Sequence, residues 1–265
     1  MGRTHFPKIT TDNLVLHLDF FNPKNFNPTT NTVTATFVND VTWERPNPQW
    51  VNFANNVVIF TRDSSTSLNV AQKNVAGGCI KTTGNLFSVA AASAVHYHIF
   101  YYNDHSFEVW FQINNPSPSN YDVTEAVSTI AGHSGYDNGF SYDTNSVDYS
   151  VWNGSVSANV ILQWTLGTSG EVKPNQWHQI VATRSGNTWR KYLNGQYVSE
   201  TTQNPAVNPL IFGLGDLAIG STWENSSNFQ YFSVSTISNL KMYNRALSNT
   251  EIQQNFDALR SRFGI

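Results

Sequence analysis

The stretch Gln176–Glu200, QWHQIVATRSGNTWRKYLNGQYVSE, decides the fold because it predicts three short β-strands in succession. Residues 177–184 alternate between two sets of side chains, with the two-residue period of a pleated strand. Ser185-Gly186-Asn187 interrupts that run with residues that tolerate turn dihedrals. The second run, Thr188–Leu193, ends at Asn194-Gly195. An Asn-Gly pair between strand-like runs is the strongest local signal for a two-residue hairpin turn, so a third strand follows it.

A second strand pattern, SFEVWFQI, occupies Ser106–Ile113. One face carries Phe107, Val109, Phe111 and Ile113, and we expect it to be core. The other face carries Glu108, Trp110 and Gln112. This mixture is typical of a sheet that turns one side toward water or a ligand.

The C-terminal segment predicts a single helix over residues 248–263. Ser248 and Glu251, three residues apart, form a capping box that starts a helix. Apolar residues follow at helical spacing, and a glycine ends the run: Ile252, Phe256, Leu259 and Gly264.

Three segments together resemble laminin-G-like domains of the concanavalin A-like lectin-glucanase jelly-roll class. They are the hairpin strands of 176–200, the strand SFEVWFQI, and the closing run Met242–Ile252, MYNRALSNTEI. The resemblance implies an all-β protein, an antiparallel β-sandwich with one short C-terminal α-helix. We find no linker or internal repeat, so we expect one domain over 1–265, with 1–100 as a divergent N-terminal part used for docking.

The remaining strands follow from alternation and from breakers rich in Asn, Pro and Gly. The first predicted strand is Leu14–Phe20, with His17 and Asp19 on its wetter side. The others are Thr32–Val41, Asn56–Phe60, Leu86–Ala94, Val127–His133, Gly139–Asp143, Val147–Val151, Val160–Thr165, Leu217–Ser221 and Phe229–Tyr243.

Composition excludes several classes of protein. The 265 residues have a formal net charge of −3 and only 12% charged residues, so no basic surface is available for nucleic acid. Cys79 is the only cysteine, which excludes an intramolecular disulfide. No apolar run approaches the roughly 20 residues of a membrane span, and the N-terminus does not resemble a secretory signal.

The sequence favours a binding protein over an enzyme. Retaining glycosidases need two carboxylates about 5–5.5 Å apart, most simply two acids close together on one strand. Glu108 on the predicted central strand has only Trp110 and Gln112 as neighbours on its face. We therefore expect no catalytic residues, and a glycoside hydrolase is the disfavoured alternative.

Calcium is the cofactor that the sequence favours most. Asp143, Asn145 and Asp148 offer oxygen ligands within one loop, as calcium prefers, although the spacing is not that of an EF-hand. An ordinary turn rich in Asp and Asn is the alternative. His96 and His98 share a strand face and are weaker candidates for a transition metal.

Carbohydrate binding requires aromatic faces beside amides and carboxylates, and three predicted rim loops supply this mixture. Their candidate residues are Tyr136, Asp137, Asn138, Tyr149, Trp152, Asn153, Trp223 and Asn225. Binding residues concentrate in such loops. Each group alone is also compatible with a turn beside a core aromatic.

The chain also resembles virion proteins of tailed bacteriophages, which carry laminin-G-like domains as capsid decorations, fibres or tail appendages. The resemblance implies a non-enzymatic protein of the particle surface, with viral capsid or tail proteins as partners. It further implies self-association into a homo-oligomer and binding to cell-surface glycan. A free carbohydrate-binding lectin is the alternative.

Overall fold

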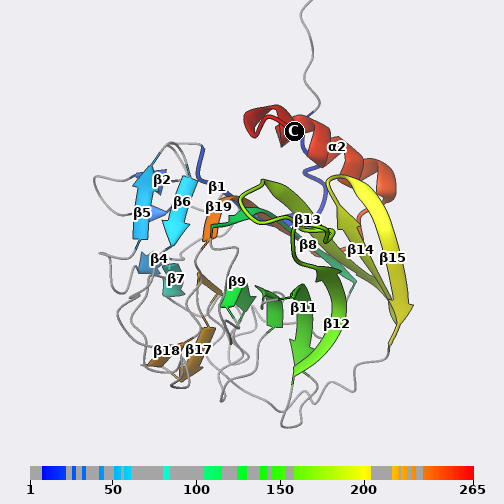
Figure 1. Cartoon of the computed structure of the whole chain (residues 1–265), viewed down its shortest axis with the longest axis horizontal. Helices are drawn as coiled ribbons and strands as arrows, with labels where there is room; N and C mark the ends of the chain where they lie inside the picture. Colours follow the sequence, from blue (N-terminus) through cyan, green and yellow to red (C-terminus); the bar gives the residue numbers. More distant parts are fainter. Residues whose placement is uncertain are drawn as a thin grey trace, which may run out of the picture.

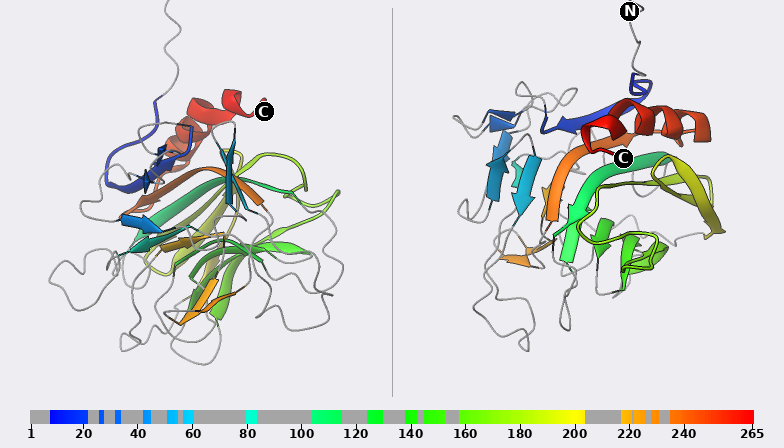
Figure 2. Two further views of the ribbon diagram at one scale, coloured as in Figure 1. Left: turned by 90° about the vertical axis from the view of Figure 1, so that its left-hand side faces the viewer. Right: turned by 45° about the horizontal axis from the view of Figure 1, so that its top comes forward.

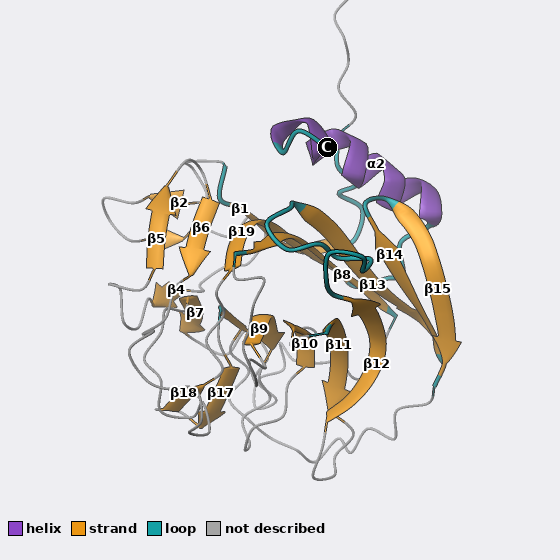
Figure 3. Ribbon diagram, viewed as in Figure 1, coloured by secondary structure: helices purple, strands orange, loops and turns teal. Residues whose placement is uncertain are grey.

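The computed structural model describes sixteen segments of the chain. They are residues 8–21, 26–27, 32–33, 42–44, 51–54, 57–60, 80–83, 104–114, 124–129, 138–142, 145–152, 158–203, 217–220, 222–225, 228–230 and 235–265. Cys79 and the predicted strand Leu86–Ala94 lie outside them. The described part is made mostly of strands, with one short helix near the C-terminus (Figure 3).

The Gln176–Glu200 stretch forms the meander that its sequence predicts. Strands β13 (His178–Ser185), β14 (Thr188–Leu193) and β15 (Gln196–Thr202) pair in antiparallel order. Asn194 and Gly195 have φ values of 49° and 80°, the two positive values that a type I′ turn requires. The Asn-Gly prediction is therefore confirmed.

The first sheet is built around β8 (His105–Ile113), which lies between β13 and β19 (Ser235–Tyr243). Its strands run in the order β15-β14-β13-β8-β19-β6-β5, with β6 at Val57–Phe60 and β5 at Val51–Ala54. Strand β1 (Leu14–Asp19) also pairs with β19.

The second sheet faces the first across the core (Figure 1). Its order is β12-β11-β10-β9-β16-β7-β4. The bounds are β12 Ala158–Thr165, β11 Ser146–Trp152, β10 Asn138–Tyr142, β9 Thr124–Thr129, β16 Leu217–Ile219, β7 Ile80–Thr83 and β4 Thr42–Glu44. Two small ladders pair β17 (Thr222–Asn225) with β18 (Asn228–Gln230), and β2 (Phe26–Asn27) with β3 (Thr32–Val33). The N-terminal part thus contributes strands to both sheets.

Aromatic side chains fill the space between the sheets. Phe107 of β8 packs against Phe140 of β10 with ring centroids 5.2 Å apart, and Phe140 packs against Tyr149 of β11 at 5.1 Å. All three are completely buried. The inward face of SFEVWFQI is core, as predicted, and the antiparallel β-sandwich is confirmed.

The closing run MYNRALSNTEI positions helix α2 (Asn249–Leu259), which continues into the 3₁₀ helix η3 (Arg260–Arg262). The capping box forms, because Ser248 Oγ accepts from the Glu251 amide while Glu251 accepts from the Ser248 amide. Arg245 bonds the same carboxylate at 2.6 Å and lowers the pKa of Glu251 to about 2. Ser106, at the start of β8, accepts from the Leu247 amide at 2.8 Å. The run therefore starts the helix and attaches it to the central strand.

This helix is not long or apolar enough to cross a membrane, and the described residues contain no other helix that is.

Helix α2 covers the outer face of the first sheet (Figure 2). Phe256 stacks on Trp110 of β8 at 5.6 Å, and Trp110 is completely buried. The prediction that the face of Glu108, Trp110 and Gln112 turns to water or ligand is wrong for the first two, because the helix seals them. Gln112, the third residue of that face, is half-buried.

The same cover buries one residue of the first strand, because Asp19 is only 7% exposed and pairs with Arg262 of η3 at 2.9 Å. Its side of β1 is still the wetter one, as predicted, since His17 is half-buried whereas the leucines on the other side are buried. Nε2 of the neighbouring His17 lies 3.0 Å from Nδ2 of Asn239 on β19. Burial and the Lys241 charge lower the pKa of His17 to about 4, so its imidazole is neutral at pH 7.

Gly195 is required for its positive φ and for the close approach of α2, whereas Gly186 is required for its positive φ alone. A Cβ at Gly195 would lie 2.8 Å from Gln253 Oε1 and 2.9 Å from Phe256 Cβ of α2, whereas one at Gly186 would meet nothing within 4 Å. Both glycines have positive φ. We expect Gly186→Ala to cost about 1–2 kcal/mol of unfolding free energy from backbone strain alone. Gly195→Ala should cost more, because the helix must also shift. Equal losses in denaturant unfolding would contradict the close packing of α2 on the hairpin.

Candidate functional site

The first candidate site is the buried polar cluster beneath α2, centred on Glu108. Lys241 Nζ lies 2.6 Å from Glu108 Oε1, and Gln179 Nε2 and Trp110 Nε1 donate to the same oxygen at 2.9 and 3.1 Å. Asn255 Nδ2 of the helix donates to Oε2 at 2.8 Å. Strand register places Glu108 directly opposite Lys241 and Gln179 directly opposite Trp110. Four donors therefore converge on one carboxylate.

Hydrogen bonds connect this cluster to the segments that pack around it. Asn255 Oδ1 accepts from the Thr10 amide at 2.7 Å, and Tyr243 Oη donates to the Thr10 carbonyl at 3.0 Å. Gln179 Oε1 accepts from the Gly195 amide at 3.0 Å, which ties the Asn-Gly turn to the cluster. The network joins the N-terminal segment, the sheet, the hairpin and the helix.

The electrostatics of the cluster favour an ionised Glu108. Burial raises the pKa of Glu108, but the Lys241 charge and the converging hydrogen bonds outweigh it, so the pKa lies below its usual range. Both side chains of the pair are 0% exposed. A general acid needs a raised pKa and access to the substrate, and Glu108 has neither. The arrangement is suited to holding the fold together.

Glu108→Gln tests that structural role. The variant leaves the Lys241 charge buried without its partner, and we expect unfolding free energy to fall by about 3–5 kcal/mol. The double variant Glu108→Gln/Lys241→Met removes the stranded charge and should recover part of the loss. Denaturant unfolding of both variants is the measurement. A loss below about 1 kcal/mol for the single variant would contradict a desolvated ion pair.

The rim-loop residues predicted to bind carbohydrate divide into three groups. Tyr149 is a correction, because its ring is completely buried in the core and its Oη lies 2.8 Å from His105 Nε2. A sugar in solution cannot reach it. The alternation of side chains along β11 does not show which face of the strand is buried, so the sequence alone could not predict this. Tyr136, Asp137 and Asn153 lie outside the described residues.

The remaining predicted residues are placed by their strands. Asn138 begins β10 and Trp152 ends β11, and the pairing of Gly139 with Ser150 brings both to the same end of this ladder. Trp223 and Asn225 lie on β17, where Trp223 pairs with Phe229 of β18. The backbone thus brings Asn138 and Trp152 together, and places Trp223 on a separate hairpin.

The predicted calcium ligands are only partly described. Asn145 is exposed, and Asp148 accepts from Gln163 Nε2 at 3.1 Å, while Asp143 lies outside the described segments, as do His96 and His98. Among the residues that the structure describes, no group of three or more His, Cys, Asp or Glu side chains could hold a metal. Calcium binding stays a prediction.

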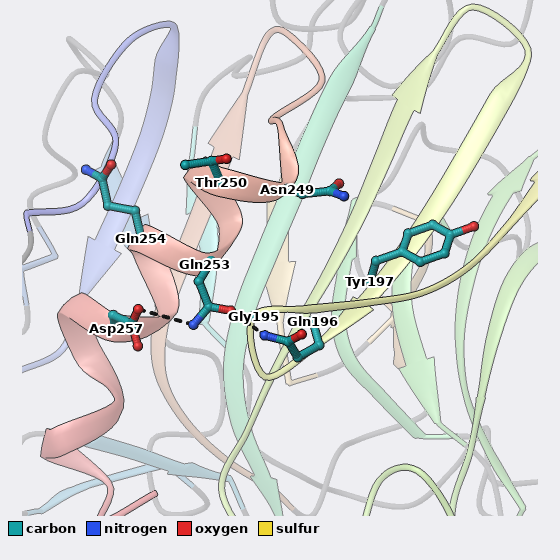
Figure 4. Close-up of a pocket in the computed structure, with 8 residues that line it drawn as sticks. All are labelled: Gly195, Gln196, Tyr197, Asn249, Thr250, Gln253, Gln254 and Asp257. Carbon is teal, nitrogen blue, oxygen red and sulfur yellow. Dashed lines mark hydrogen bonds between the residues drawn. The ribbon is translucent and has the colours of Figure 1, made fainter.

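A second candidate site is a groove of about 560 Å³ between α2 and the start of β15 (Figure 4). Its lining residues are mostly amides and hydroxyls: Gly195, Gln196, Tyr197, Asn249, Thr250, Gln253, Gln254 and Asp257. The apolar stripe of the helix, which predicts its packing on the sheet, does not indicate this groove. The signal that could have found it is the polar stripe Asn249, Gln253 and Asp257, spaced four residues apart, beside the Asn-Gly turn.

Comparison with protein families gives a match over more than half of the chain. A model described as the concanavalin A-like lectin/glucanases superfamily matches residues 87–253. No curated protein sequence matches the chain.

Solved structures match nearly the whole chain at low identity. The binding domain of botulinum neurotoxin DC, in complex with rat synaptotagmin II, is 13% identical with a TM-score of 0.62, covering 94% of this chain and 52% of that one. A structure of botulinum neurotoxin type C, whose cell entry is described as dependent on interaction with two ganglioside molecules, is 15% identical with a TM-score of 0.63. The match covers 94% of this chain and 51% of that one. The chain therefore spans about half the length of these structures. The likeness establishes the fold.

Proposed function

Because the chain belongs to the concanavalin A-like lectin/glucanases superfamily, we propose that it is a carbohydrate-binding protein without hydrolytic activity. The superfamily description names two activities, binding and hydrolysis. The observation that favours binding is the state of Glu108, the acid of the central strand, which is completely buried and bonded to Lys241. A glycosidase needs such an acid exposed beside the scissile bond.

The structurally similar proteins support the same conclusion by analogy. The first is a binding domain in complex with the protein synaptotagmin II, and the second is described with two molecules of a glycolipid, ganglioside. A sandwich that presents loops and edges to solvent is suited to this role, because binding residues concentrate on loops held by a rigid scaffold. The rim residues remain the proposed contacts from sequence, with Tyr149 excluded because it is buried. They are Tyr136, Asp137, Asn138, Trp152, Asn153, Trp223 and Asn225.

A glycan array and a hydrolysis assay on the same polysaccharides test this function. We expect weak binding of the wild type to some glycans, and weaker binding of Trp152→Ala and Trp223→Ala, because aromatic platforms carry sugar contacts. We expect no release of reducing ends from glucans, galactans or agars. Reproducible release by the wild type would show that the protein is an enzyme.

The proposed setting is the surface of a bacteriophage particle, with capsid or tail proteins as partners. Support comes from the sequence resemblance to phage virion proteins. In the described part of the chain β15 pairs only with β14, and an edge strand of this kind is a surface for self-association into a homo-oligomer. The N-terminal part would dock the domain. A free lectin is the alternative.

Mass spectrometry of purified phage particles from the source of this sequence tests the setting. We expect the protein in stoichiometric amounts in the particle, and immunogold labelling on its outside. Its absence from particles, together with secretion of the free protein, would favour the free lectin instead.

A further inference from the structure

We propose that the groove between α2 and the start of β15 is a second saccharide-binding site, which takes a neutral oligosaccharide. The proposal rests on the carbohydrate-binding function given above and adds a site independent of the rim loops. Ligand pockets commonly have volumes of about 300–1,000 Å³, and the groove, at about 560 Å³, lies within that range.

The aromatic surface of the groove is Tyr197. It is 46% exposed, one of three large apolar side chains in the described residues that are exposed. Its ring contacts Tyr192 at a centroid distance of 5.8 Å and an interplanar angle of 75°, which holds the ring in place. An ordered, exposed aromatic ring is the feature against which the C–H groups of a sugar pack.

The amides of the groove are oriented before any ligand arrives. Tyr192 Oη donates to Asn249 Oδ1 at 2.8 Å, which leaves the Asn249 amide N–H groups as donors. Gln196 Nε2 donates to Gln253 Oε1 at 2.5 Å, which leaves Gln196 Oε1 as an acceptor. Figure 4 shows Asn249 extending from the helix toward the strand that carries Tyr197. Fixed donors and acceptors suit hydroxyl groups, which donate and accept, and their order lowers the entropy cost of binding.

Charge favours a neutral ligand over an anionic one. The acid in the groove, Asp257, accepts from Gln253 Nε2 at 3.2 Å and pairs with Arg260 at 3.2 Å. A sialylated or phosphorylated ligand would meet this carboxylate, whereas a neutral glycan can use it as a hydrogen-bond acceptor.

The walls of the groove are held at a fixed separation. The Gln196–Gln253 bond crosses from the hairpin to the helix, and the Tyr192–Asn249 bond does the same at the first helical turn. Gly195 allows the close approach, since a Cβ there would meet Phe256 at 2.9 Å. The groove is therefore formed without a ligand, rather than opened by one.

Titration with neutral gluco-, galacto- and manno-oligosaccharides, followed by NMR of the side-chain amides, tests the site. We use the double variant Trp152→Ala/Trp223→Ala, so that rim binding is removed, and then add Tyr197→Ala. We expect the double variant to retain binding with shifts at Asn249 and Gln253, and Tyr197→Ala to weaken it roughly tenfold. Tyr197→Phe should bind nearly as well, because the ring remains.

Phe21→Ala, at an exposed aromatic outside the groove, is the matched control, with thermal melting to confirm folding of each variant. Loss of all binding in the double rim variant, with Tyr197→Ala alone neutral, would overturn the groove and leave the proposed function intact. Tighter binding of sialylated than of neutral probes would overturn the assignment of ligand. No glycan binding by the wild type at either place would overturn the proposed function itself.

Discussion

The Glu108 carboxylate is the constraint on which the rest of the structure depends. It lies completely buried on the central strand, and its donors come from β19, β13, β8 itself and α2. An unpaired carboxylate there would be very costly to bury, so these elements must assemble around it together. Gln179 extends the constraint to the Asn-Gly turn, and Asn255 extends it to Thr10. One charge thus sets the positions of the hairpin, the helix and the N-terminal segment.

The burial of Glu108 beneath α2 also limits which surfaces of the protein can bind a ligand. Because α2 seals Glu108 and Trp110 on the outer face of the first sheet, a ligand cannot reach these two side chains. Within the described segments, the junction where the helix meets β15 offers a groove, and the rim loops stay as the sites predicted from sequence. At that junction the close approach through Gly195 creates the groove lined by Tyr197 and Asn249. The helix that removes one candidate site therefore builds another.

The features of the fold that neighbouring residues determine could be predicted from the sequence. The features that depend on contacts between distant segments could not. Asn194-Gly195 and the Ser248–Glu251 box are decided by neighbouring residues, so the sequence alone could place both. The burial of Glu108 and Asp19 depends on α2 and η3, which lie more than a hundred residues away in the chain. Tyr149 failed as a site residue for a similar reason, since alternation does not say which face of a strand another sheet covers. The groove needs both the turn and the helix, and no single segment indicates it.

The most direct test of the account is a crystal structure of the protein with a neutral oligosaccharide bound. The account predicts an intact glycan in contact with Tyr197 or with the rim loops, α2 in place, and the Glu108–Lys241 pair unchanged at about its present 2.6 Å separation. A glycan within hydrogen-bond distance of Glu108, with α2 displaced from the sheet, would contradict it. That result would make Glu108 a residue of an active site rather than the anchor of the fold.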